Sequence, residues 1–190
     1  MYKRQIWDKF IVKSPLLGNY QKHNIRGVIA WASQMHILEI IPLEISKLKS
    51  GIENVLINTQ LKGRFQTISA QNPEIIVDTA HNEAGIQCVL DQISNNNNRD
   101  LTIIIGMVKD KDVKKVLHVL PNNAYYIFTE ISNPRKLDKF ELEELAMETG
   151  KKGITLDDVN IAVDFVKKNR TDHQVLIIGS TYLIAEINEL

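Results

Sequence analysis

Short β-branched runs alternate with longer segments of helical periodicity over the C-terminal two-thirds of this chain, and this alternation constrains its fold most strongly. Four runs are typical of strands, at residues 74–78, 101–106, 124–130 and 174–179. Apolar residues spaced by three and four predict helices at 82–94, 110–120, 138–149 and 157–169, and a final helix at 182–190. The pattern indicates successive βα units around a parallel sheet.

Continuous apolar strands such as Ile103-Ile104-Ile105 are typical of burial on both faces, so helices should cover both sides of the sheet. Residues 64–69 can pair with residues 75–78 across a turn and add an antiparallel strand. The upstream part predicts two helices and an edge strand, at 20–34, 42–50 and 6–12. The predicted fold class is therefore α/β, with a Rossmann-like, mostly parallel sheet, an antiparallel edge and helices on both faces.

Composition and charge exclude several classes of protein. The 190 residues are 44% hydrophobic and 24% charged, which is typical of a globular domain with one core. Lys+Arg and Asp+Glu both number 23, so the basic excess of a general nucleic-acid binder is missing. Apolar runs fall far short of the roughly 20 residues that cross a bilayer. Cys88 has no second cysteine to pair with, and no signal-peptide pattern follows Met1, so we expect a cytoplasmic protein without nucleic-acid or membrane partners.

Ligands of an open α/β sheet bind outside the carboxyl ends of its strands, so these ends hold the candidate site residues. Asp78-Thr79-Ala80-His81-Asn82 places a carboxylate, an imidazole and an amide between a strand and a helix start, which suits an anionic ligand. The alternative is that Asp78 and Asn82 are only caps and that His81 is a surface residue. Ser180, at another strand end, either faces a ligand or caps a helix.

Two arginines are further candidates. Arg64 lies beside a glycine in Gly63-Arg64-Phe65-Gln66, just before a predicted strand, and a guanidinium suits bidentate contact with phosphate or carboxylate. Arg64 can equally be a surface residue paired with a carboxylate. Arg135, in Asn133-Pro134-Arg135 after the strand at 124–130, either faces the same crevice or is structural.

Several motifs are absent from the sequence. It has no G-x-x-x-x-G-K-[ST] phosphate loop and no G-x-G-x-x-G after a strand. It also has no C-x-x-C, no H-E-x-x-H and no G-x-S-x-G, and its five histidines are scattered. The residues alone therefore support neither a triphosphate cradle, nor a metal centre, nor a hydrolytic triad.

Six segments together resemble the C-terminal domain of folylpolyglutamate synthase, which is often bifunctional with dihydrofolate synthase and belongs to the Mur ligase superfamily. They are SPLLGNYQKHN at 14–24, GRFQ at 63–66, IVDTAHN at 76–82, GMVKDKD at 106–112, NPR at 133–135 and GSTY at 179–182. The combination of G-R-F-Q with D-x-A-H-N favours the folate branch over the peptidoglycan ligases.

The resemblance implies an enzyme that uses ATP and Mg²⁺ to phosphorylate the carboxylate of a folate or dihydropteroate, after which L-glutamate attacks the acyl phosphate. It implies that Asn24, Arg64 and Asp78 contact ATP, with Arg64 on the phosphates and the other two toward the nucleoside. His81 is the implied catalytic residue, and His81 and Ser180 would bind glutamate or the reacting carboxyl group. The family's D-G-A-H-N-P reads D-T-A-H-N-E here, a change that can alter the turn and the helix start.

The resemblance also implies a domain organisation. Residues 1–17 would be a linker and the end of an N-terminal ATPase domain, and residues 18–190 a Mur ligase C-terminal-type domain. The family's P-loop and magnesium ligands belong to that N-terminal domain, so we assign no metal ligand here and expect this chain, taken alone, to be a monomer without ligase turnover. Two alternatives stay open. One is a Mur-type ligase joining an amino acid to a peptidoglycan precursor; the other is a receiver-like module, which predicts paired acids where Asp78 stands alone.

Overall fold

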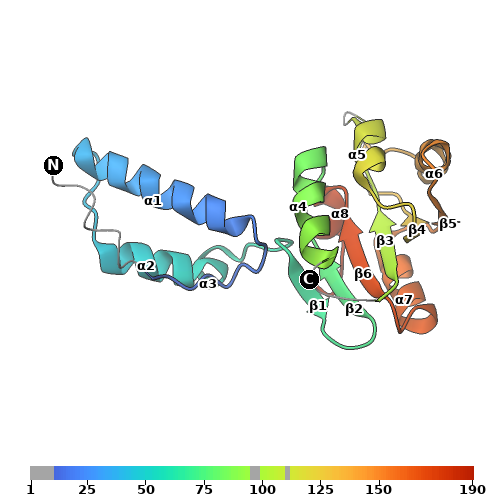
Figure 1. Ribbon diagram of the computed structural model, residues 1–190, viewed down its shortest axis with the longest axis horizontal. Helices are drawn as coiled ribbons and strands as arrows, with labels where there is room; N and C mark the ends of the chain where they lie inside the picture. Colours follow the sequence, from blue (N-terminus) through green and yellow to red (C-terminus); the bar gives the residue numbers. More distant parts are fainter. Residues whose placement is uncertain (1–10, 95–98, 110–111) are drawn as a thin grey trace. The chain divides into compact units, whose positions relative to one another are not determined.

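The computed structural model describes residues 11–94, 99–109 and 112–190. The chain divides into two compact units, Met1–Lys62 and Gly63–Leu190, each of which has its own fold (Figure 1). This division differs from the domain boundary after residue 17 that the resemblance implies. The boundary after residue 17 stays a prediction.

The described residues of the first unit form three helices, α1 (Gln21–Ile37), α2 (Ile45–Glu53) and α3 (Val55–Thr59). The first two confirm the helices expected from periodicity. The sequence did not predict α3, because its five residues are too few to show a helical period. Of the edge strand expected at 6–12, residues 6–10 lie outside the described residues, and Ile11 and Val12 are in no strand.

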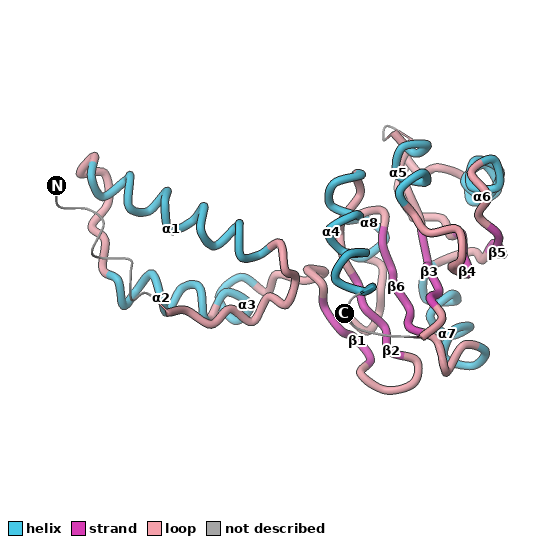
Figure 2. Tube along the Cα trace, in the orientation of Figure 1, coloured by secondary structure: helices cyan, strands magenta, loops and turns pink. Residues whose placement is uncertain are grey.

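In the second unit, the described strands form one sheet of six in the order β1-β2-β6-β3-β4-β5. They are β1 (Gln66–Ser69), β2 (Glu74–Val77), β3 (Leu101–Ile105), β4 (Tyr125–Phe128), β5 (Lys152–Thr155) and β6 (Gln174–Ile178). The β1 strand pairs with β2 antiparallel, and every other pairing is parallel. The mostly parallel sheet with an antiparallel edge is thus confirmed, and Figure 2 shows its strands in magenta.

The β5 strand was not expected, and its glycine explains why. Gly153 lies so close to β4 that a Cβ there would be 1.9 Å from the carbonyl oxygen of Tyr126. Only glycine fits this position, and a glycine in a four-residue strand removes the side-chain pattern by which strands are found.

The helices of the second unit are α4 (Glu83–Ser94), α5 (Val113–Val119), α6 (Lys139–Glu148), α7 (Val159–Asn169) and α8 (Thr181–Ala185). The side chains of Asp112, Asp138 and Asp158 accept N–H groups of the first turns that follow them, as N-caps do. The final helix is shorter than the predicted 182–190, because beyond Ala185 the backbone makes hydrogen bonds between residues three apart.

Apolar side chains are buried on both faces of the sheet. One face packs against α7 and α8, and its strand residues are Ile75, Val77, Ile104, Ile127, Val175 and Ile177. The alternate strand residues point to the other face and are also buried, among them Ile76, Ile103, Tyr126 and Phe128. Contacts of α5 with α4 and α6 form the helical layer over that face. The two-sided covering expected from the continuous apolar strands is confirmed (Figure 1).

Candidate functional site

The five parallel strands end at one edge of the sheet, and after four of them the chain continues at Asp78, Gly106, Thr129 and Gly179. The loops after β3 and β6 approach each other closely at their glycines. A Cβ on Gly179 would lie 3.0 Å from the carbonyl oxygen of Gly106, and the φ of Gly179 is +118°, which L side chains rarely adopt. The glycines therefore allow a close backbone junction at the edge where ligands of such sheets bind.

The carboxylate of Asp78 is buried, with 2% of the residue exposed, and it binds two backbone N–H groups. Its Oδ1 accepts from Ala80 and its Oδ2 accepts from Phe65, both at 2.8 Å. Phe65 has a φ of +51°, a left-handed conformation that is uncommon for a non-glycine residue. Asp78 thus fastens the segment before β1 to the loop after β2.

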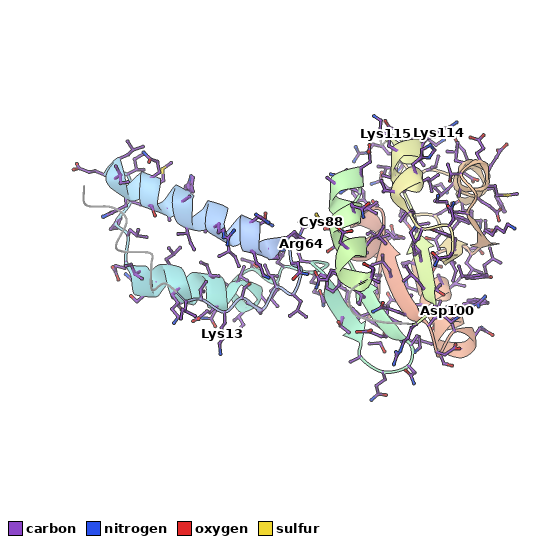
Figure 3. All side chains as sticks on the ribbon, in the orientation of Figure 1. Lys13, Arg64, Cys88, Asp100, Lys114 and Lys115 are labelled. Carbon is purple, nitrogen blue, oxygen red and sulfur yellow. The ribbon has the colours of Figure 1, made fainter. Side chains whose placement is uncertain are left out.

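Thr79 joins the G-R-F-Q segment to the D-T-A-H-N segment. Its backbone N–H donates to the carbonyl of Gly63 at 3.0 Å, and its hydroxyl accepts from the guanidinium of Arg64. Its carbonyl lies 3.0 Å from Nδ1 of His81. The structure therefore brings Arg64, Asp78 and His81 together around the end of β2, and Figure 3 labels Arg64 there.

The imidazole of His81 is oriented by its contact with the Thr79 carbonyl. A carbonyl oxygen only accepts hydrogen bonds, so this contact requires the proton to be on Nδ1. In the neutral ring, Nε2 then carries the lone pair and can accept a proton. The arrangement suits a general base.

A cleft of about 350 Å³ lies over the same edge of the sheet. It is lined by His81, Val108, Arg135, Gly179, Ser180, Thr181 and Tyr182. Two predicted site residues, His81 and Ser180, therefore share one cavity. Ser180 is 3% exposed, and its Oγ accepts the N–H of Tyr182 at 3.2 Å, so it also caps α8.

The three residues predicted to contact ATP, Asn24, Arg64 and Asp78, do not line this cleft. Arg64 and Asp78 both contact the loop that carries His81. Asn24 belongs to the first unit, where its amide donates to Oε1 of Gln21 at 3.0 Å. It lines a separate, apolar cleft between α1 and α2.

Arg135 and Tyr182 complete the cleft wall. The sequence left the role of Arg135 open, and Tyr182 appeared there only as the last residue of the GSTY segment, with no role assigned. A guanidinium nitrogen of Arg135 donates to the Tyr182 hydroxyl at 2.6 Å, and its central carbon lies 5.5 Å from the ring centroid. No Asp or Glu is among the described residues that line the cleft. The positive charge of the Arg135 guanidinium therefore suits an anionic group such as a carboxylate or phosphate.

The described residues contain neither a metal-binding cluster nor a membrane-spanning helix. Over residues 11–94, 99–109 and 112–190, no three side chains of His, Cys, Asp or Glu stand close enough to hold a metal ion. Within the same ranges, no helix has the length and apolar character needed to traverse a bilayer.

A mostly parallel sheet with a cleft over the carboxyl ends of its strands defines the second unit as an α/β domain whose candidate site lies where ligands of such sheets bind. The family model for the Mur ligase, glutamate ligase domain, matches residues 63–181, which is most of this unit. The chain belongs to this family of ligases.

Individual relatives agree with this assignment. The dihydrofolate synthase/folylpolyglutamate synthase of Buchnera aphidicola is 27% identical over 150 residues, 77% of this chain and 34% of the relative. The UDP-N-acetylmuramoyl-L-alanyl-D-glutamate--2,6-diaminopimelate ligase of Oceanobacillus iheyensis is 26% identical over 177 residues, 88% of this chain and 34% of the relative. The chain thus spans about a third of the length of these two relatives.

Solved structures show the same fold. The Mycobacterium tuberculosis folylpolyglutamate synthase, complexed with ADP and AMPPCP, matches with a TM-score of 0.73 and 24% identity. The match covers 92% of this chain and 40% of that protein. The Mur ligase C-terminal type of fold, expected from the resemblance, is confirmed.

Proposed function

We propose that this chain supplies the amino-acid-binding part of an ATP-dependent ligase that adds L-glutamate to the carboxylate of a folate or a dihydropteroate. The observation that carries the proposal is the convergence of His81, Arg135 and Ser180 on one cleft from three separate motifs. The similarity to a dihydrofolate synthase/folylpolyglutamate synthase supports the choice of substrate.

The cleft residues match the chemistry of amide formation. Glutamate carries two carboxylates, and the guanidinium of Arg135 suits one of them. In the proposed reaction, the glutamate nitrogen attacks the carbonyl carbon of an acyl phosphate, a C–N bond forms, and phosphate leaves with the electron pair of the broken C–O bond. The nitrogen must lose a proton, and Nε2 of His81 is suited to accept it, since Nδ1 is held by the Thr79 carbonyl.

The proposed ATP contacts fit the structure to different degrees. Arg64 is half-buried beside Thr79, and its guanidinium is of the type that binds phosphate, so we assign it to the ATP phosphates. Both carboxylate oxygens of Asp78 already accept backbone N–H groups, so the contact of Asp78 with the nucleoside, like that of Asn24, rests on the resemblance alone. Bound ATP and Mg²⁺ would supply the phosphoryl group and neutralise its charge, with metal ligands from outside the described residues.

A P-loop ATPase domain is the proposed partner of the first unit. The chain matches only about a third of the length of its relatives, which leaves room for such a domain in a longer protein. In the first unit, Val28 and Trp31 of α1 are about half exposed and Ile57 of α3 is 79% exposed. Exposed large apolar side chains such as these three are typical of a surface that another domain covers.

An NMR titration of the ¹⁵N-labelled chain with L-glutamate tests the amino-acid assignment. We expect L-glutamate to shift the backbone amide signals of His81, Arg135 and Ser180 in a saturable way, and His81→Ala to weaken binding. The matched control is His118→Ala, which removes an exposed histidine of α5 and should leave binding unchanged. Absence of any saturable shift would contradict the proposal.

A peptidoglycan ligase domain is the second candidate, because a diaminopimelate ligase matches 88% of the chain. The same titration with meso-diaminopimelate separates the two functions. Binding of meso-diaminopimelate in preference to L-glutamate would favour the peptidoglycan branch, and the reverse preference supports the folate branch.

A further inference from the structure

Two backbone hydrogen bonds hold the loop that carries Arg135 to the cleft. The carbonyl of Arg135 accepts the N–H of Lys109 at 2.8 Å, and the carbonyl of Met107 accepts the N–H of Leu137 at 2.9 Å. Because Met107 and Lys109 follow β3, the loops after β3 and β4 form one framework. The backbone position of Arg135 is therefore fixed independently of any ligand.

The side chain of Arg135 is exposed and has several rotatable bonds, so a ligand would have to order it unless a protein group does so first. Tyr182 is such a group. Its hydroxyl accepts from Nη2 of Arg135 at 2.6 Å, and its ring centroid lies 5.5 Å from the guanidinium carbon. The hydrogen bond directs the guanidinium toward the cleft wall, and the ring lies beside it.

Tyr182 is itself held in place. It lies in the first turn of α8, and its N–H donates to the buried Oγ of Ser180 at 3.2 Å. The next two residues, Leu183 and Ile184, are 0% and 2% exposed and belong to the core. The backbone of Tyr182 is thus anchored at the cleft wall, and its phenol, in a side chain that is 41% exposed, reaches Arg135 from there.

We propose that Tyr182 is a positioning residue that holds the Arg135 guanidinium at the cleft and thereby makes the cleft prefer an amino acid with a side-chain carboxylate. The inference rests on the function proposed above and assigns Arg135 to the side-chain carboxylate of glutamate, which glutamine lacks. A planar guanidinium can bind both oxygens of a carboxylate in parallel, whereas an amide offers only one oxygen. A guanidinium held by Tyr182 should therefore distinguish L-glutamate from L-glutamine, and one without this hydrogen bond should do so less well.

The substitution Tyr182→Phe tests this role, because it removes the hydroxyl and keeps the ring. We expect the variant to bind L-glutamate about fivefold to tenfold more weakly than the wild type, which corresponds to the typical net contribution of one hydrogen bond. Binding of L-glutamine should change little, so the preference for glutamate falls by a similar factor. Both affinities are measured by NMR titration of the whole chain.

Tyr125→Phe is the matched control. Tyr125 also stacks with an arginine, since the guanidinium carbon of Arg170 lies 3.8 Å from its ring centroid, but it begins β4, away from the cleft. We expect this variant to keep the wild-type preference for glutamate.

The outcomes separate the inference from the proposed function. If Tyr182→Phe keeps the wild-type ratio of glutamate to glutamine affinity, the positioning role is wrong and the proposed function stands. Equal weakening for both amino acids, together with a lower melting temperature, would show a merely structural role and would also overturn the inference. If the wild type binds no L-glutamate, both the inference and the proposed function fall.

Discussion

The carboxylate of Asp78 accepts the backbone N–H of Phe65 at 2.8 Å, across a separation of 13 residues, and so holds a left-handed residue beside Arg64. This hydrogen bond stabilises the φ of +51° at Phe65, a conformation that is uncommon for a non-glycine residue. The position of Arg64 therefore depends on a buried carboxylate that does not itself line the cleft.

Removal of the Asp78 carboxylate should destabilise the second unit. Asp78→Ala leaves the N–H groups of Phe65 and Ala80 without their acceptor, and we expect a loss of about 3 kcal/mol in the free energy of unfolding. Urea unfolding followed by circular dichroism measures it. The control is Asp164→Asn, an exposed aspartate of α7, which should change stability by less than about 0.5 kcal/mol. Equal stability of the two variants would contradict the role of Asp78.

Substitutions of two glycines should have opposite effects. Gly153→Ala would place a Cβ 1.9 Å from the Tyr126 carbonyl oxygen, so β5 must move away from β4 and stability should fall by at least about 2 kcal/mol. Gly27→Ala, inside α1, meets nothing within 4 Å and should stabilise its helix by up to about 1 kcal/mol. Thermal and urea unfolding of both variants test the pair. A stable Gly153→Ala variant with β5 amides still protected from hydrogen exchange would contradict the close approach.

The buried amino group of Lys151 should make stability depend on pH. Burial lowers the pKa of Lys151 below its usual value, although its Nζ donates to Asn122 at 2.9 Å and to the Thr149 carbonyl at 3.1 Å. Between the folded pKa and the ordinary value of about 10.4, the unfolded chain binds more protons than the folded one, so stability rises with pH across that window.

Lys151→Met should remove this rise, while Lys152→Gln, which changes an exposed neighbour, should keep it. Urea midpoints measured at several pH values up to 10.5 give the comparison. A wild-type slope that survives Lys151→Met would assign the pH dependence to another group.

Taken alone, the chain should show no ligase turnover. The proposed reaction needs a site that binds the triphosphate of ATP, and the sequence has no phosphate-loop motif. ADP release and incorporation of labelled glutamate into dihydropteroate or a reduced folate should both stay at background. Measurable ATP-dependent glutamate addition by this chain alone would contradict the prediction.

The buried strands and their helices could be predicted from the sequence, because runs such as Ile103-Ile104-Ile105 combine β-branched residues with burial on both faces. Short elements could not. The β5 strand is interrupted by the glycine that its packing requires, and α8 ends early in three-residue turns.

The site was predictable residue by residue but not as a cavity. The motifs indicated His81 and Ser180 separately, yet their shared cleft depends on strand order, which places β6 directly beside β2. The part played by Tyr182 depends on a side-chain contact with Arg135 across 47 residues, and no local pattern encodes such a contact.

The place of β6 in the sheet has a consequence for how the protein is made. This strand is synthesised after the other five described strands, yet it lies between β2 and β3. Until the ribosome has released it, the nascent chain can hold only two half-sheets, each with an open hydrogen-bonding edge. Translation that stalls before residue 174 should therefore leave an aggregation-prone intermediate with unpaired strand edges. Such an intermediate should need a chaperone until β6 has been synthesised and has paired with β2 and β3.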